Sequence, residues 1–326
     1  MIRIHFLNVR NGDCVLFQRH NRLSMIDICC GNLGKDDLSK AVIAEGQIKK
    51  PRGNYKMCDR PTNPIDYMNA FGFTSIWRFI LTHPDMDHMD GLKRLSESIN
   101  IQHFWDCGIR RDKPVFDEAS PYSQEDWGYY QDLIGGKIEE TRVIGPRAGD
   151  RGKFWNADDD ENNGSGDDLH IVSPSEKLVD LANNNGDIND ASYVLVYRSS
   201  AGNVVFAGDS NNKTWDYIIE EHKDLVKDAG LLFAPHHGRK SDRDYSFLDI
   251  VKPRISFFGC APSEHLAYSA WQYRDLLYFT NNQCGNVHID PVGSKFRVFI
   301  ENYNYAADYT RNNTYKQNGY WFLCEI

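Results

Sequence analysis

Five side chains able to bind a metal ion or move a proton fall within eight residues of one another. They are His83, Asp85, Asp87, His88 and Asp90. The apolar run at residues 76–81 predicts a buried strand before them, and residues 91–95 open a helical pattern after them. Imidazoles and carboxylates on such a strand-to-helix loop can converge on one or two divalent ions. A solvated acidic turn ahead of a helix is the simpler interpretation, but it leaves both histidines unexplained.

Composition restricts the class of protein around this loop. The chain has 326 residues, with 41% hydrophobic and 25% charged, which is ordinary for a globular protein that is not embedded in a membrane. No apolar run approaches a membrane span, and the N-terminus enters a strand pattern without a signal sequence, so we expect a cytoplasmic protein without membrane partners. The net charge of −9 excludes a global basic field, so any nucleic-acid binding must use a local patch.

The eight cysteines are scattered and include no Cys-x-x-Cys pair. Cys14, Cys29, Cys30 and Cys260 lie in apolar, strand-like stretches. This pattern favours reduced, buried thiols over a zinc ribbon or a disulfide scaffold.

The first part of the chain predicts a β-hairpin that leads toward the loop. Residues 2–9 and the run from Cys14 alternate like strands around an Asn-Gly turn, and residues 23–31 predict a third strand. Asp27 lies in that third strand; on spacing alone, an ordinary strand-end Asp explains it equally well. Residues 64–72 predict a helix with an Asn63 cap. Residues 32–63 and 153–168 predict inserted loops, the second rich in acidic residues and glycine.

Polar side chains recur at strand ends in the second half. Asp209 follows an apolar run at residues 203–207, His236 and His237 follow another at 231–234, and His265 comes after a third at 255–260. Such a layout predicts two mixed β-sheets flanked by helices, with a site at one edge.

These motifs together resemble the metallo-β-lactamase superfamily, and within it the hydrolase domain of ComEC-like competence proteins and their stand-alone relatives. The resemblance rests on the loop at 82–88, the Asn-Asp-x-Ser at 189–192, Gly208-Asp209 and the Pro-His-His-Gly at 235–238, in this order. It covers about residues 3–287. It implies an αββα sandwich in a single domain of residues 1–326, with a core at about 1–290 and a strand extension at 291–326. Asp85 departs from the family pattern, because a His usually stands there.

The resemblance also implies a role for each site residue. Asp209 would bridge two ions, His83 and Asp85 would bind the first ion, and Asp87, His88 and His265 the second. No His stands where the first ion's third His is expected, so Asp190 or Asn189 would fill that gap. Asp27 would support the metal loop from behind, and His236 and His237 would line the site as catalytic residues. A carboxylate in place of an imidazole favours Mn²⁺ or Mg²⁺ more than an all-His site does, with Zn²⁺ also compatible, as one or two ions.

Three functions follow from this interpretation. The first is a phosphodiesterase, with DNA as the expected substrate, that uses a metal-bound hydroxide oriented by Asp87. Arg239, Lys240 and Arg243 are the cations best placed to contact phosphates. The second is a hydrolase of a small ester, lactone, thioester or nucleotide at the same centre. The third is a non-catalytic member of the family that binds a partner. Whether the chain binds a protein partner or forms a homodimer is left open.

Overall fold

The structure is a computed structural model that describes residues 2–9, 11–19, 22–30, 53–152, 156, 167–261 and 265–326. Most of the two predicted inserted loops, 32–63 and 153–168, lies outside these residues. Among the described residues, no helix is long and apolar enough to cross a lipid bilayer. All eight cysteines are free thiols, as the sequence predicts.

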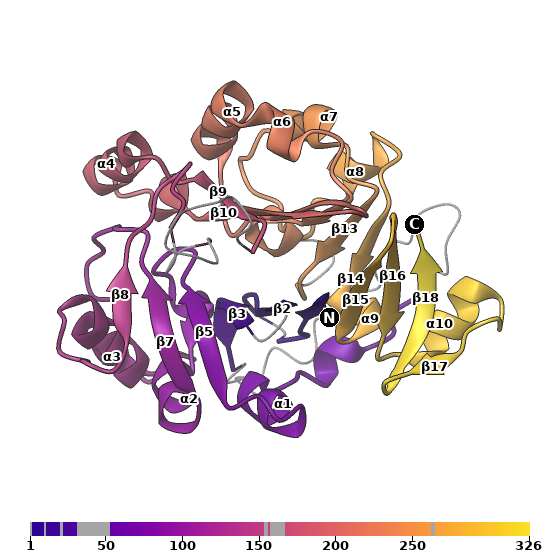
Figure 1. The fold of residues 1–326 in the computed structure, drawn as a ribbon, viewed down its shortest axis with the longest axis horizontal. Coiled ribbons are helices and arrows are strands. Elements are labelled where there is room, and N and C mark those ends of the chain that lie inside the picture. Colours follow the sequence, from indigo (N-terminus) through magenta and orange to yellow (C-terminus); the bar gives the residue numbers. More distant parts are fainter. Residues whose placement is uncertain are drawn as a thin grey trace.

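Two mixed β-sheets form the centre of the fold (Figure 1). In the described residues the larger sheet has ten strands, in the spatial order β17 (Lys316–Gln317), β18 (Tyr320–Glu325), β16 (Lys295–Ile300), β15 (Val287–Val292), β1 (Ile2–Phe6), β2 (Val15–Arg19), β3 (Arg22–Ile26), β5 (Ser75–Ile80), β7 (Asn100–Trp105) and β8 (Arg142–Ile144). The smaller has six, in the order β14 (Tyr278–Thr280), β13 (Ile255–Phe258), β12 (Leu231–Phe233), β11 (Gly202–Phe206), β10 (Val194–Ser199) and β9 (Leu169–Ser173). β4 (Ile28–Cys29) and β6 (Met89–Asp90) pair separately.

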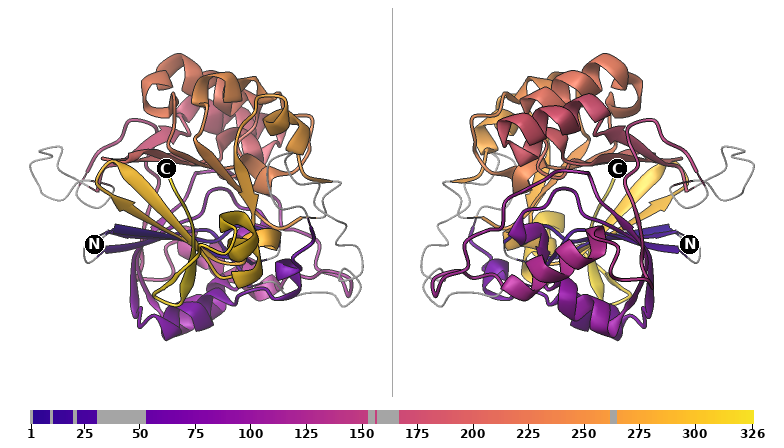
Figure 2. Two further views of the ribbon diagram at one scale, coloured as in Figure 1. Left: turned by 90° about the vertical axis from the view of Figure 1, so that its right-hand side faces the viewer. Right: turned by 90° about the vertical axis from the view of Figure 1, so that its left-hand side faces the viewer.

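Helices cover the outer face of each sheet (Figures 1 and 2). The larger sheet carries α1 (Pro64–Ala70), α2 (Leu92–Ser98) and α3 (Gln124–Ile134). The smaller sheet carries α5 (Asn212–Glu221), α6 (Lys223–Val226), α7 (Leu248–Val251) and α8 (Tyr268–Gln272). α4 (Glu176–Asn185), α9 (Asn281–Cys284) and α10 (Tyr303–Thr310) contribute to the core between the sheets. The predicted sandwich of two mixed sheets flanked by helices is confirmed.

Alternating side chains build three hydrophobic layers. In β11, Val204 and Phe206 pack between the sheets, while Val205 packs under the outer helices. In β2, Phe17 faces the inter-sheet core and Leu16 faces the opposite helical layer. Because successive strand residues point to opposite faces, one apolar run serves two layers. The strands after residue 290, predicted as an extension, add β16, β18 and β17 to one edge of the larger sheet.

Candidate metal centre

The predicted ligands meet where several strands end on the same edge of the sandwich. β3 runs parallel to β5, and β11 runs parallel to β12, so their carboxyl ends lie together. Asp27 follows β3, His83 follows β5, Asp209 follows β11, and His237 follows β12 within the 3₁₀ segment η5 (Pro235–Gly238). Polar groups at the carboxyl ends of neighbouring parallel strands share one crevice.

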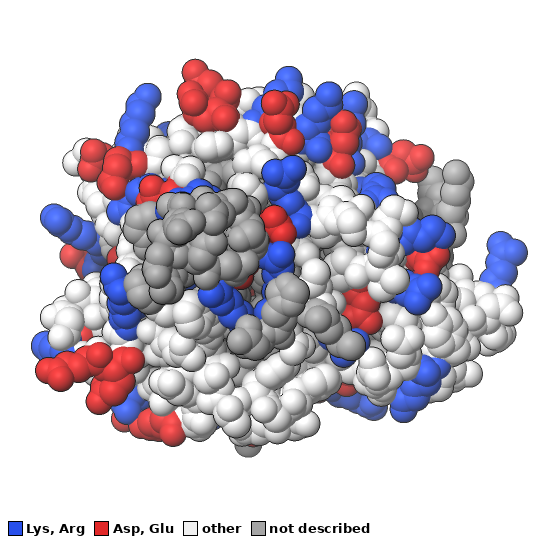
Figure 3. Space-filling model, in the orientation of Figure 1, with Lys and Arg blue, Asp and Glu red and all other residues white. Residues whose placement is uncertain are grey.

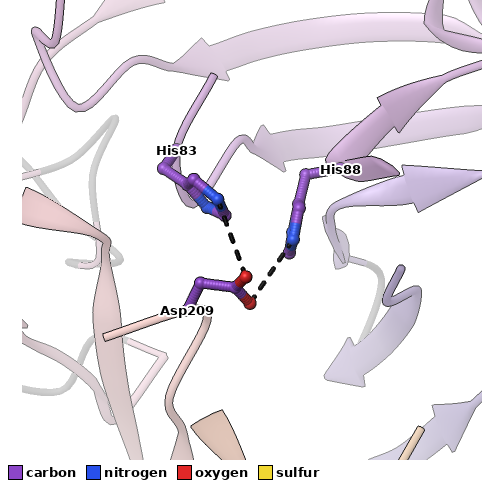
Figure 4. A group of neighbouring side chains, drawn as sticks. All are labelled: His83, His88 and Asp209. Atoms are coloured by element: carbon purple, nitrogen blue, oxygen red, sulfur yellow. Dashed lines mark ion pairs between the residues drawn. The ribbon is translucent and has the colours of Figure 1, made fainter. Parts of the chain in front are cut away.

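Asp209 lies at the centre of the histidines, and Figure 4 shows its carboxylate facing two of them, His83 and His88. Its Oδ1 lies 3.4 Å from Nε2 of His88 and 3.8 Å from Nε2 of His237. Its Oδ2 lies 3.8 Å from Nε2 of His83 and 3.7 Å from Nε2 of His236. The two oxygens of one carboxylate therefore face different imidazoles, as a carboxylate shared between two ions requires.

Asp87 completes the arrangement on the Oδ1 side. Its carboxylate oxygens lie 3.7 Å from Nε2 of His88 and 3.3 Å from Nε2 of His237. The ligand atoms form three overlapping groups, and within each group all atoms lie within 4.8 Å of one another. The groups are His83, His88 and Asp209; Asp87, His88 and His237; and Asp13, Asp209 and His237. We call these six residues the Asp209 centre.

The far nitrogens of the same imidazoles have oxygen partners. Nδ1 of His88 donates to Asp27 at 2.7 Å, and Asp27 also accepts from the backbone and hydroxyl of Thr82. Nδ1 of His237 lies 3.1 Å from Oδ1 of Asp13, within ion-pair distance but without the geometry of a hydrogen bond among the described residues. A carboxylate behind an imidazole fixes the ring and leaves Nε2 directed at the centre, which is how metal-binding histidines are usually supported.

The residues fit a divalent ion because several of the buried atoms that face the centre form no hydrogen bond among the described residues. Among the described residues, no hydrogen bond reaches Nε2 of His83, His88 or His237, or Oδ1 of Asp209, and all are buried. Leaving several polar atoms buried and unpaired costs about 1–3 kcal/mol each. Imidazole nitrogens and carboxylate oxygens together suit Zn²⁺ or Mn²⁺.

His236 differs from its neighbour His237 in the group that lies behind it. Nη1 of Arg243 donates to Nδ1 of His236 at 2.8 Å. A guanidinium has no acceptor, so Nδ1 of His236 must accept and the ring proton must lie on Nε2. Nε2 then offers an N–H group, not a lone pair, toward Oδ2 of Asp209. His236 is therefore set up as a hydrogen-bond donor and not as a metal ligand.

The backbone at these positions is held in an unusual conformation. Asp27, His236 and His237 have φ of 57°, 53° and 57°, in the left-handed region that non-glycine residues rarely adopt. Such conformations cost about 1–3 kcal/mol each and concentrate at functional sites. Gly12 has a steric role, because a Cβ there would come within 1.9 Å of the Asp87 carbonyl oxygen. That glycine lets the β1–β2 turn bring Asp13 against the metal loop.

The buried acids and imidazoles of the centre shift one another's pKa values. Burial opposes ionisation of Asp209, but His237 and His88 outweigh it and hold the pKa of Asp209 well below its usual value. Burial also opposes protonation of His237, yet Asp13 and Asp209 raise its pKa to about 10. Burial and the proximity of His88 lower the pKa of His83 to about 3. Burial likewise lowers the pKa of His236 to about 4, which keeps that ring neutral.

Three predicted ligands lie outside the Asp209 centre. The carboxylate of Asp85 pairs with Arg111 at 2.7 Å and caps Met86 at the start of η3 (Met86–His88). Asp190 is fully buried, but Lys213 binds its Oδ2 at 2.8 Å. His265 is exposed and belongs to none of the ligand groups formed by the described residues.

His237, and not His265, lies beside the residues that the resemblance assigned to the second ion. Its imidazole approaches His88, Asp87 and Asp209. His265 instead accepts a hydrogen bond from the Lys240 amide through its backbone carbonyl. Asp85 and Asp190 are likewise taken up by the cations that pair with them.

The predicted phosphate-binding cations have different surroundings. Lys240 is exposed and Arg239 is half-buried at the end of η5. Arg243 is committed to the centre, because its guanidinium also donates to the backbone carbonyls of Asp209 at 2.6 Å and Ser210 at 3.0 Å. Arg243 is thus a positioning residue in this structure, and Arg239 and Lys240 remain the predicted substrate contacts.

The sequence analysis did not identify Asp13 as part of the site. It also did not predict that Arg243 contacts His236. Asp13 directly follows the Asn-Gly turn, and a carboxylate beside a tight turn was the available signal. Nothing local in the sequence distinguishes Arg243 from Arg239, because only the fold places its guanidinium against His236.

Comparisons with other proteins give structural likeness alone. No protein-family model matches the chain, and no curated protein matches it in sequence. Solved structures that resemble it include Igni18, a metallo hydrolase from Ignicoccus hospitalis (12% identity, 88% of this chain and 99% of that one, TM-score 0.48). Others are Tm1679, a metal-dependent hydrolase of the β-lactamase superfamily (15%, 86% and 96%, 0.48), and the metallo-β-lactamase fold protein YhfI from Bacillus subtilis (11%, 85% and 96%, 0.46). At these identities and TM-scores we infer nothing about this chain from the activities of those proteins.

Proposed function

We propose that this chain is a metal-dependent hydrolase that cleaves phosphodiesters, with DNA as its substrate. The observation that carries the proposal is the convergence of unpaired, buried imidazole nitrogens on the two oxygens of Asp209. A purely structural cluster would satisfy those atoms with hydrogen bonds. A hydrolase needs them available for an ion.

The residues divide into two groups around Asp209. Asp87, His88 and His237 would hold one ion with Oδ1 of Asp209, and His83 would contribute to a second with Oδ2. When bound, a divalent ion supplies acidity to a water molecule and positive charge beside the attacked phosphorus. Asp27 and Asp13 keep the ligand rings in place, because each lies against the far nitrogen of one imidazole.

His236 provides the donor that the ligands lack. Its Nε2–H points toward Oδ2 of Asp209, and Arg243 prevents the proton from moving to Nδ1. A neutral N–H in this position can donate to a phosphate oxygen or to the departing oxygen. Preorganised donors of this kind stabilise charge that develops during the reaction.

The choice of phosphodiesters rests on charge near the centre. Arg239 and Lys240 follow the His236–His237 pair after Gly238, and Lys240 is exposed. The net charge of the chain is −9, and acidic and basic side chains are interspersed on the face drawn in Figure 3. A DNA strand would therefore have to be held at this local pair of cations.

A substrate panel tests the proposal. Linear single-stranded and double-stranded DNA, RNA, bis(p-nitrophenyl) phosphate, a carboxylic ester and a lactone are each incubated with Mn²⁺, Mg²⁺ or Zn²⁺. We expect cleavage of DNA and of the small phosphodiester by the native chain and none by Asp209→Asn, which controls for contaminating nucleases. Hydrolysis of the ester or lactone alone would establish the small-molecule alternative, and no hydrolysis with any ion would favour a binding protein.

The double variant Arg239→Glu with Lys240→Glu tests the DNA component separately. We expect weaker DNA binding and a flatter salt dependence, with the slope of log affinity against log salt reduced by about 0.7–0.9 for each phosphate that the protein no longer neutralises. Cleavage of bis(p-nitrophenyl) phosphate should stay near the native rate, because that substrate is too small to reach both cations. Equal loss of activity on both substrates would assign these residues to the fold or to the metal centre.

A further inference from the structure

The Oδ1 side of Asp209 offers one ion enough ligands. Nε2 of His88 lies 3.4 Å and Nε2 of His237 lies 3.8 Å from this oxygen, and both imidazoles form a ligand group with Asp87. An ion held there would have at least three protein ligands, as transition-metal sites in proteins usually do. His88 also belongs to a group with His83 and Asp209, but its Nε2 has a single lone pair and can serve only one ion.

The Oδ2 side presents one imidazole lone pair and one N–H group. Nε2 of His83 lies 3.8 Å from Oδ2, and Nε2 of His236 lies 3.7 Å from it. The Thr82 hydroxyl donates to Asp27 at 2.7 Å, so its oxygen accepts from Nδ1 of His83, 3.1 Å away, and Nε2 of His83 keeps a lone pair. Arg243 donates to Nδ1 of His236, so the proton of that ring lies on Nε2. Of these two rings, only His83 offers an ion a lone pair.

The carboxylates that the resemblance offered beside His83 have other partners. The Asp85 carboxylate pairs with Arg111 at 2.7 Å. The Asp190 carboxylate accepts from Lys213 at 2.8 Å. Neither acid belongs to the ligand groups that the described residues form. Among the described acids and histidines, a second ion would therefore have only His83 and Oδ2 as ligands, fewer than the three or four that transition-metal sites usually have.

Arg243 places a positive charge behind the Oδ2 side. Its guanidinium donates to Nδ1 of His236 and to the backbone carbonyls of Asp209 and Ser210. Within the part of the chain that the structure describes, it forms no ion pair with a carboxylate. No directly bound acid neutralises this charge, so it opposes a further cation next to His236.

We propose that the centre binds one transition-metal ion, on the Oδ1 side of Asp209, and that Arg243 keeps a second ion off the Oδ2 side. The guanidinium acts in two ways, because its charge repels the ion and its hydrogen bond holds the lone pair of His236 away from the centre. The inference rests on the metal-dependent function proposed above and narrows its two groups of ligands to one occupied position. The Oδ2 side stays open to a substrate oxygen, to which Nε2 of His236 donates.

Titration with Mn²⁺ tests the number of ions directly. Metal-free native chain is titrated while electron paramagnetic resonance follows the bound ion, and equilibrium dialysis with mass spectrometry gives the number of Mn²⁺ and Zn²⁺ ions per chain. We expect one ion per chain and the spectrum of isolated Mn²⁺. Two ions of similar affinity, with the spectrum of an exchange-coupled pair, would overturn the proposal, and so would a chain that binds no ion.

Neutral variants of Arg243 test its part in excluding the second ion. Arg243→Met removes the charge and the donor, so a second Mn²⁺ should bind about 10–100-fold more tightly than to the native chain, the range usual for a group behind a metal-binding ring. Arg243→Gln removes the charge but keeps an N–H donor, so it should act in the same direction with a smaller effect. It also replaces Arg243→Met if that variant does not fold.

Two controls retain the native behaviour. Arg243→Lys keeps a charge and N–H donors, so it should bind one ion as the native chain does. Arg254→Met removes a guanidinium that donates to the carbonyl of Ala201, at the opposite end of β11 from Asp209, and should also bind one ion. A second-ion affinity that is the same in the native chain and in both neutral Arg243 variants would overturn the role assigned to Arg243.

None of these measurements uses a substrate, so this inference and the proposed function can fail separately. One bound ion in a chain that cleaves no phosphodiester would support the inference while the proposed function fails. Two bound ions in a chain that cleaves DNA would overturn the inference and leave the proposed function intact.

Discussion

Two buried clusters of histidines in this molecule have opposite electrostatic surroundings. The Asp209 centre places each imidazole within 4 Å of at least one carboxylate. The second cluster, on the helix-covered face of the larger sheet, consists of His5, Tyr67, His288 and Tyr320. There, Nδ1 of His5 lies 2.7 Å from Tyr67 Oη and 3.0 Å from Nε2 of His288. We call this second group the His5–His288 cluster.

The pKa values of His88 and His237 are set by their carboxylate partners, whereas those of His5 and His288 are set mainly by burial. Burial and Arg3 lower the pKa of His5 to about 3, and burial and His5 lower that of His288 to about 2. His88 and His237 are buried at least as deeply, yet carboxylates raise the pKa of both. Burial without an acidic partner therefore keeps His5 and His288 neutral, whereas acidic partners let the equally buried His88 and His237 carry a proton.

The largest effect is expected on removing Asp209. Asp209→Asn keeps the volume but removes the charge that every nearby imidazole faces, so activity should fall by at least about 10³-fold and the bound metal should dissociate. His288→Asn, the matched change in the other cluster, should retain metal and turnover in the folded protein. Kinetics, metal analysis and circular dichroism on both variants check this. Full metal retention in Asp209→Asn would show that the Asp209 carboxylate is not needed for metal binding, contrary to the difference proposed between the two clusters.

His236 should affect turnover without affecting metal. His236→Ala removes the Nε2–H donor, and we expect kcat to fall by about 10²–10³-fold with unchanged metal stoichiometry. His236→Gln, whose amide N–H lies near the original Nε2, should restore part of the rate. Metal loss in His236→Ala would show that the ring is a ligand and that Arg243 does not fix its proton.

Asp13 should act through metal affinity. Asp13→Asn removes the carboxylate behind His237, so the affinity for Mn²⁺ or Zn²⁺ should fall by about 10–100-fold, the usual cost of losing such support. At saturating metal the rate should recover toward that of the native chain. A rate that stays low at saturation would instead give Asp13 a direct part in the reaction.

The His5–His288 cluster should make the fold sensitive to acid. Both pKa values are lowered on folding, so below about pH 6.5 the unfolded chain binds more protons than the folded one, and stability falls as pH falls toward 3. The loss should reach up to about 1.4 kcal/mol per histidine for each pH unit. The free energy of unfolding of His288→Asn, measured with urea between pH 7 and 5, should change less steeply with pH than that of the native chain. The same pH dependence of the unfolding free energy in both proteins would mean that these histidines do not remain neutral in the folded state.

The sequence was sufficient to predict the parts of this picture that depend on local pattern. Alternating apolar runs predicted the strands, and the Asn63 cap predicted the start of α1, where Asn63 Oδ1 accepts from Ile65 and Asp66. Residues 82–88 and Gly208-Asp209 predicted where the ligands would gather. Each of these features can be predicted from the residues of a single helix or strand and the loop that follows it.

What the sequence did not predict depends on contacts between distant segments. Asp85 and Asp87 are the same residue type two positions apart, and Arg111 draws only the first away. His236 and His237 are adjacent, yet Arg243 lies behind one and Asp13 behind the other. No local pattern separates such pairs, because the deciding partner comes from another element.

Metal analysis of the native chain is the most direct test of the central claim. Protein prepared without chelators is analysed by mass spectrometry for Zn, Mn, Mg and Fe, and its crystals are examined for anomalous scattering. We expect at least one transition-metal ion per chain, with the scattering peak between His88, His237 and Asp209. Protein that contains no metal, shows no peak at this position and binds neither Mn²⁺ nor Zn²⁺ on titration would contradict the claim.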